Sequence, residues 1–167
     1  MKITVLSIFT IFFLASSCKS LKYTKEEDLK NIKMPFQEKD YPDSENAFFS
    51  IQNAKGLKLN LMRDRVTLAA KNDLANRILT TINTIAEQSL SFINEEEKES
   101  FESRAKSIST QSMSKVMKVD SKTLREKKGD QYDYWAVFKL SLEDVTNLIN
   151  NSNLGFDVSS EQLFKAE

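Results

Sequence analysis

The spacing of hydrophobic residues changes several times along the chain, and each spacing predicts a different element. The segment 47–56 is rich in aromatic and β-branched residues and ends in Gly56, which predicts a strand that runs into a turn. Over residues 59–92 apolar side chains instead recur at steps of three and four, which predicts one long helix of about nine turns. Ala69, Ala70 and Ala75 predict that the first half of this helix lies closely on a sheet.

The second half of the long helix carries Ile78, Ile82 and Ile85. From the sequence these residues pack either against the next helix of the same chain or against a second subunit. That next helix is predicted to begin at residues 95–97, three glutamates, because acidic side chains stabilise a helix N-terminus. These adjacent carboxylates do not predict a metal site, since neighbouring helical residues point about 100° apart.

A hairpin is predicted in the second half of the chain. Polar and apolar residues alternate over 116–125, which is typical of a strand, and Gly129 marks the turn in 127–130. Residues 132–140 form the strongest strand pattern, with apolar side chains on both faces around 135–138. This strand is therefore predicted to be central in the sheet, with one face on the long helix.

A short helix is predicted after the hairpin, because Ser141 and Asp144 match a capping box. From Asn150 onward the chain is rich in Asn and Ser, so residues 151–167 are predicted to form a frayed tail in which only Phe156 and Phe164 make contacts. The predicted fold class is α+β. One long helix packs on a short antiparallel sheet, in the order β-α-α-β-β-α, over a domain of residues 41–150.

Composition excludes several classes of function. The 167 residues contain no His, one Cys and three scattered Gly, with 24 basic and 24 acidic side chains. Without His, nucleophilic systems that use a histidine base and metal sites that use a histidine ligand are excluded. The zero formal charge gives no reason to expect a nucleic-acid partner. No enzymatic activity, no metal and no cofactor are expected.

The N-terminus has the pattern of a secretory signal peptide over residues 1–17. Lys2 precedes an apolar run over 3–14, and small residues at 15–17 precede Cys18. The apolar run is too short to span a bilayer, which requires about 20 residues.

The position of Cys18 resembles the lipobox of bacterial lipoproteins, in which the cysteine becomes the acylated N-terminus. The sequence departs from that pattern because Ala15 occupies the place where Leu is usual. The resemblance implies a covalent lipid on Cys18. The alternatives are ordinary secretion with a free thiol and an uncleaved anchor, which the short apolar run disfavours. Lys19 in place of Asp implies the outer membrane, with the periplasmic or surface face left open.

Residues 18–40 are predicted to be a flexible tether between the lipid and the domain, because they are strongly charged and lack sustained periodicity. The lysines of this segment either belong to a solvated spacer or contact anionic lipid head groups.

The order of these features resembles the LPP-twenty family of bacterial lipoproteins. The shared features are a lipobox, the step Tyr41-Pro42, a strand ending at Gly56, the long helix and the hairpin strand 132–140. This resemblance covers residues 41–148 and implies a small α+β domain displayed at the cell envelope. The family has no defined catalytic residues, so none is carried over.

The candidate interaction residues are Tyr132, Tyr134 and Trp135, because aromatic side chains often anchor interfaces. Alternation places Tyr132 and Tyr134 on one face of the strand and Trp135 on the other, so at most one of these two sets can be exposed. The alternative is that both sets pack in the core. We expect an interaction or assembly module that binds envelope proteins or further copies of itself. The alternative function is a carrier that holds a lipid or another apolar ligand between the long helix and the sheet.

Overall fold

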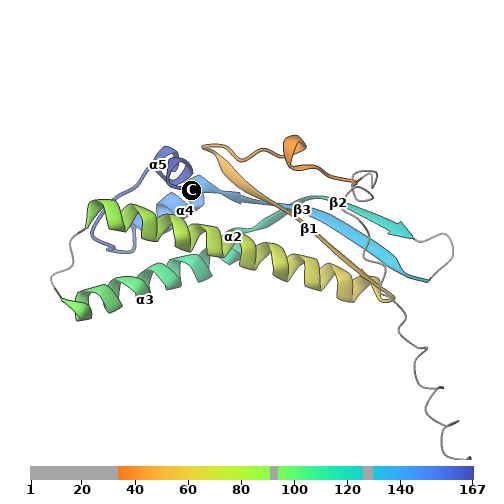
Figure 1. The fold of residues 1–167 in the computed structure, drawn as a ribbon, viewed down its shortest axis with the longest axis horizontal. Coiled ribbons are helices and arrows are strands. Elements are labelled where there is room, and N and C mark those ends of the chain that lie inside the picture. The colour runs from red at the N-terminus through yellow and green to blue at the C-terminus, as the bar shows by residue number, and fades with distance from the viewer. Residues whose placement is uncertain (1–33, 91–93, 126–129) are drawn as a thin grey trace, which may run out of the picture. The chain divides into compact units, whose positions relative to one another are not determined.

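Three antiparallel strands form the sheet, in the spatial order β1-β3-β2 (Figure 1). The computed structural model describes residues 34–90, 94–125 and 130–167, and the residues from Met34 onward form one compact unit. The predicted signal peptide, Cys18 and Gly129 of the predicted turn lie outside the described residues. The elements are η1 (Glu38–Asp40), β1 (Ala47–Gly56), α2 (Leu59–Ser89), α3 (Glu95–Ser112), η2 (Met113–Lys115), β2 (Met117–Arg125), β3 (Tyr132–Ser141), α4 (Leu142–Asn150) and α5 (Ser160–Lys165).

The α+β fold class, the order β-α-α-β-β-α and the central position of β3 are confirmed. β1 pairs with β3 from Ala47 opposite Ser141 to Gly56 opposite Tyr132. β2 pairs with the other side of β3, and the register shifts between Lys118 and Asp120. This shift is a β-bulge, so β3 has a complete ladder on one side and an interrupted ladder on the other.

Helix α2 lies over β1 and β3 and forms one core with them (Figure 1). Ala70 is fully buried, as its small side chain predicted, whereas Ala69 is exposed on the far side of the helix. At the start of the helix a Cβ on Gly56 would lie 2.7 Å from Met62 Cε, so the strand end and the helix approach closely. The predicted contact between the first half of this helix and the sheet is confirmed.

The second half of α2 extends beyond the sheet and packs on α3. A helix of 31 residues is about 46 Å long, whereas a strand of 10 residues spans about 33 Å. Ile78, Ile82 and Ile85 are buried in the same cluster as Phe101 and Ile108 of α3. A buried hydrogen bond of 2.6 Å from Ser109 Oγ to the Ala75 carbonyl also joins the two helices. Of the two interpretations, packing against the next helix of the chain is therefore correct.

The capping box predicted at Ser141 is absent, although the helix itself is present. Ser141 is the N-cap of α4 but makes no capping hydrogen bond through its side chain. It is also the last residue of β3 and lies opposite Ala47 in the sheet. The Leu142 N–H donates to the Asn46 carbonyl at 3.0 Å, so the helix start is joined to the residue before β1 instead.

The prediction of a frayed tail over residues 151–167 is wrong. The tail contains α5, whose capping box is formed by Ser159 and Gln162 with hydrogen bonds of 3.2 and 2.8 Å. Leu154, Val158 and Leu163 are buried in the main core. The polar residues of this segment make local caps and turns, and the apolar residues between them anchor it.

The predicted boundary between tether and domain also changes. Residues 34–40 belong to the compact unit, and residues 38–40 form a short 3₁₀ turn. The rings of Phe36 and Tyr41 lie 6.0 Å apart, and those of Tyr41 and Phe49 lie 5.9 Å apart. This row of rings ties the start of the unit to β1.

Candidate interaction surface

The three aromatic residues predicted as an interaction surface are separated by the sheet, as their alternation required. Tyr134 is only 3% exposed and belongs to the core beneath α2, where Arg63 lies 5.8 Å from the centre of its ring. Tyr132 is partly buried at the end of β3, with Arg125 at 5.9 Å from its ring. Tyr134 therefore contributes to packing, and only Tyr132 of this pair has accessible surface.

Trp135 is partly buried on the opposite face of the sheet from Tyr134. Its indole Nε1 is buried and has no hydrogen-bond partner among the described residues. The neighbouring Val137 is fully buried on this same face. Trp135 thus lies in a second, smaller apolar layer on the side of the sheet away from α2.

Strand β2 presents the most accessible surface of the sheet, and the sequence did not single it out. All nine of its residues are exposed. Met117 is 56% exposed, Val119 46% and Leu124 37%, although such side chains are normally covered when they lie in a sheet. β2 is an edge strand, so one side of its backbone has no neighbouring strand in the sheet. An edge of this kind can pair with another chain.

Asp120 of β2 accepts two hydrogen bonds. The Tyr41 hydroxyl donates to Asp120 Oδ2 at 2.8 Å, and the Ser121 N–H donates to Asp120 Oδ1 at 2.7 Å. The first bond joins β2 to the segment that precedes β1. It also raises the pKa of the Tyr41 phenol, with burial and the negative charge of Asp120 acting in the same direction.

At the other edge of the sheet, the backbone of β1 is hydrogen-bonded near the start of the strand. The Phe49 N–H donates to Asp43 Oδ1 at 2.6 Å, and the Phe49 carbonyl accepts from Arg77 Nη1 at 3.0 Å. Ser44 and Ala47 also form an isolated bridge beside the start of the strand. The backbone of β1 therefore already has partners from its own chain at this point.

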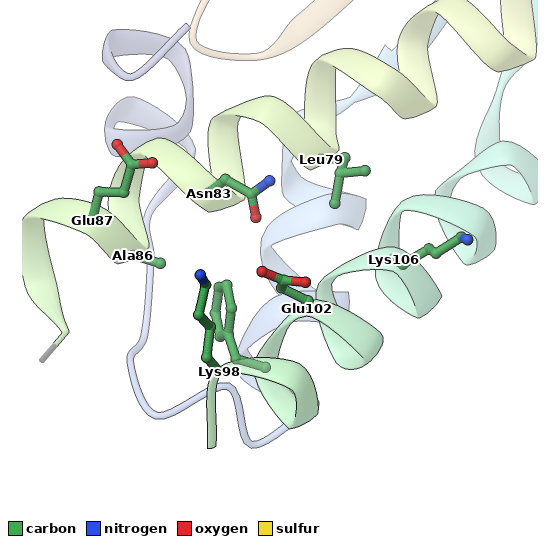
Figure 2. Close-up of a pocket in the computed structure, with 8 residues that line it drawn as sticks. Leu79, Asn83, Ala86, Glu87, Lys98, Glu102 and Lys106 are labelled. Carbon is green, nitrogen blue, oxygen red and sulfur yellow. The ribbon is translucent and has the colours of Figure 1, made fainter. Parts of the chain in front are cut away.

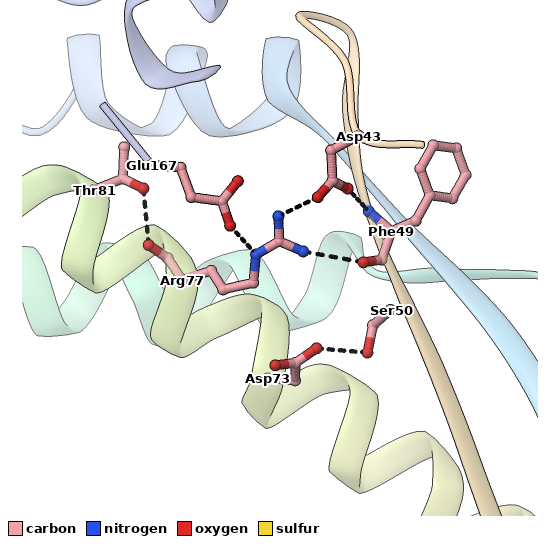
Figure 3. Close-up of polar contacts among 7 residues, drawn as sticks. All are labelled: Asp43, Phe49, Ser50, Asp73, Arg77, Thr81 and Glu167. Carbon is pink, nitrogen blue, oxygen red and sulfur yellow. Dashed lines mark hydrogen bonds and ion pairs between the residues drawn. The ribbon is translucent and has the colours of Figure 1, made fainter. Parts of the chain in front are cut away.

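Arg77 is the centre of a polar cluster that joins three segments (Figure 3). Its guanidinium forms ion pairs with Asp43, which precedes β1, and with Glu167 beyond α5. It also lies 4.4 Å from the centre of the Phe48 ring. Burial acts to lower the pKa of Arg77, but the hydrogen bonds to Glu167 and Asp43 outweigh it, so that the pKa is raised. These contacts indicate a structural clamp.

Beside the clamp, the Ser50 hydroxyl donates to Asp73 Oδ2 at 2.6 Å (Figure 3). The Gln52 amide donates to the same hydroxyl at 3.0 Å. A hollow of about 470 Å³ adjoins these groups. The carboxylates that line it include Asp43 and Glu167, which are paired with Arg77. Asp43, Asp73 and Glu167 of this lining are therefore already bound to other side chains of the protein.

A groove of about 330 Å³ lies between α2 and α3 (Figure 2). Asn83 and Ala86 of α2 face Lys98 and Glu102 of α3 across it. The charged side chains of its lining, two acidic and two basic, are exposed. The groove is open to solvent and favours neither sign of charge.

The described ranges 34–90, 94–125 and 130–167 contain no group of three or more His, Cys, Asp or Glu side chains placed to hold a metal ion. Within the same ranges, every helix is too short or too polar to cross a bilayer. Comparisons with protein-family models, curated proteins and solved structures give no match to this chain.

Proposed function

We propose that this protein is a lipid-anchored cell-envelope protein whose α+β domain binds other proteins and catalyses no reaction. The anchor is a covalent lipid on Cys18, which holds the protein at the outer membrane. The basis for this part is the signal-peptide pattern of residues 1–17 with its cysteine, together with the resemblance to the LPP-twenty lipoproteins. Three acyl chains would make the attachment effectively permanent, since one chain alone binds a membrane only marginally.

The observation that carries the binding role is the exposed edge of β2. It combines an open strand edge with three exposed apolar side chains, the combination used when a chain adds a strand to a sheet. Leu57, Leu61 and Leu68 are also exposed, just before α2 and in its first turns, but the carbonyl and N–H groups along a helix bond to one another and do not form the open row that an added strand needs. β2 is therefore the preferred binding surface.

The packing of the core favours this role over the alternative role as a carrier. A carrier would hold its ligand between α2 and the sheet, against the face that bears Ile78, Ile82 and Ile85. Ile78 and Ile82 are fully buried and Ile85 is 8% exposed, all within the core cluster. The space that a carrier would need is occupied by side chains of the protein itself.

Photo-crosslinking in living cells tests the proposal. A photoreactive amino acid replaces Leu124 on β2 in the full chain, and a matched variant carries it at Asn76, which is exposed on α2. We expect protein adducts at position 124, in the membrane fraction, and none at position 76. The variant Cys18→Ser should lose acyl labelling and the membrane-bound adducts.

Three results would contradict the proposal. Equal adducts at both positions, or none at position 124, would remove the binding role from β2. Acyl labelling that persists in Cys18→Ser would show that the lipid is attached elsewhere.

A further inference from the structure

We propose that β2 pairs in antiparallel orientation with β2 of a second copy of this chain, with Ser121 opposite Ser121 of the other copy. This inference rests on the proposed binding role of β2 and names the partner. The two sheets would join into one continuous sheet. Both copies of α2 would lie on the same face of it, because pairing Ser121 with itself sets the two-fold axis perpendicular to the sheet.

The first argument is the difference between the two edges of the sheet. At β1, Asp43 and Arg77 bind the N–H and the carbonyl of Phe49, so an added strand would have to displace them. Along β2 all nine residues are exposed, and Met117, Val119 and Leu124 offer apolar surface. The Ser121 N–H is held by the side chain of the adjacent residue Asp120, which an added strand can displace without moving another segment. An added strand therefore fits at β2.

The second argument is charge. Asp120 and Lys122 lie opposite Val137 and Trp135 of β3, so both side chains project from the face away from α2. With Ser121 at the centre, Asp120 of each copy lies opposite Lys122 of the other copy. The two-fold symmetry makes this pair twice, and opposite charges directly across an antiparallel pair are stabilising.

The neighbouring registers lack this complementarity. Centring the pair on Lys122 places two lysines directly opposite each other, and centring it on Asp120 places two carboxylates opposite each other. Both arrangements are destabilising, because the opposed charges have the same sign. Centring it on Thr123 places Lys122 opposite Leu124 and forms no ion pair. Lysines and a bulge generally discourage edge pairing. Here the charges of Asp120 and Lys122 favour the register centred on Ser121 over these three.

A contact formed by a single pair of nine-residue strands buries little surface and should be weak in dilute solution. Complexes that bury less than about 1,200 Å² are typically transient. Attachment to one membrane would raise the effective concentration of the two copies and favour pairing. The test is therefore made on the full chain in cells.

The symmetry of the pair allows a cysteine test. Opposed residues of an antiparallel pair have Cα atoms about 4.5–5.5 Å apart, which is within the range that a disulfide bridges. Ser121→Cys should give a disulfide-linked dimer on a non-reducing gel. Thr123→Cys tests the register centred on Thr123, and Asn76→Cys tests for nonspecific cross-linking. Neither should give more dimer than the unsubstituted chain. The unsubstituted chain also controls for disulfides through Cys18.

The charge pair then tests the register within the Ser121→Cys chain. Asp120→Lys alone and Lys122→Asp alone should each lower the cross-linked fraction about tenfold, because each sets like charges opposite each other twice. Co-expression of the two variants, one of them tagged, should restore the cross-link between unlike copies only. Tyr41→Phe controls for the hydrogen bond that Asp120→Lys also removes and should leave the cross-linked fraction unchanged.

The outcomes separate this inference from the proposed function. Absence of the Ser121→Cys dimer, together with photo-adducts at position 124 that contain another protein, would overturn self-pairing and leave the binding role standing. Failure of co-expression to restore the cross-link would overturn the register. Absence of both the dimer and the adducts would overturn both proposals.

Discussion

Arg77 and Asp43 are separated by 34 residues in the sequence and form an ion pair with an Nη2–Oδ2 distance of 2.5 Å. The same guanidinium binds the Phe49 carbonyl and Glu167. One side chain of α2 therefore holds the segment before β1, β1 itself and the residue beyond α5.

Replacing Arg77 by Met should lower the free energy of unfolding by about 2–3 kcal/mol, because two carboxylates and one carbonyl lose a charged donor in a partly buried site. Denaturant unfolding measures the change. Arg65→Met is the matched control, since Arg65 is exposed on the same helix, and it should change stability by less than about 0.5 kcal/mol. Equal effects at the two positions would show that the clamp adds nothing.

Two adjacent alanines on α2 should differ in how much stability is lost when each is replaced by a larger side chain. Ala70→Leu forces extra atoms into the filled contact between α2 and the sheet and should destabilise the protein by about 1–3 kcal/mol. Ala69→Leu places the same atoms in solvent and should be nearly neutral. Thermal unfolding of the two variants side by side tests the packing, and an equal loss in both would contradict it.

The C-terminal segment should contribute to global stability. Leu163 is fully buried, so Leu163→Ala should cost about 2–4 kcal/mol. Glu161→Ala removes the exposed pair with Lys165 and should leave the free energy of unfolding nearly unchanged. A frayed tail would instead make both substitutions neutral in denaturant unfolding.

The Tyr41 phenol should ionise at a higher pH than that of a free tyrosine. Its hydrogen bond to Asp120 raises the pKa above the ordinary value of 10.0. The stability from this bond is therefore fully present below pH 10.0 and is lost as the pH rises through the folded-state pKa. The tyrosinate absorbance of the unsubstituted protein minus that of Tyr41→Phe gives the titration of this one group. Asp120→Asn should shift that titration to lower pH, and an unchanged midpoint would exclude the bond.

Periodicity along the chain predicted most of the fold. The three- and four-residue steps placed α2, and apolar residues on both faces of 132–140 placed β3 at the centre, because both signals extend over long segments. α5 was missed because it has only six residues, and its apolar anchors are separated by Asn and Ser that serve as caps. Short helices of this kind are held by tertiary contacts more than by their own pattern.

The candidate surface was harder to predict than the fold. The sequence indicated a strand at β2, but the exposure of that strand depends on strand order and on how far α2 extends over the sheet. Tyr134 was singled out as an aromatic residue, yet its face of β3 lies under α2. The Arg77 clamp involves Asp43 and Glu167, which are close only after folding.

The register of β1 against β3 has a consequence for the order of folding. Ala47, the first residue of the first strand, lies opposite Ser141, the last residue of the third strand, with both long helices between them in sequence. The β2–β3 hairpin closes a far shorter loop, and loop-closure entropy rises with loop length. Contacts between distant segments also slow folding. We expect β2 and β3 to pair early, and β1 to dock onto them late, with the collapse of α2. The first strand to be synthesised would thus be the last to join the sheet.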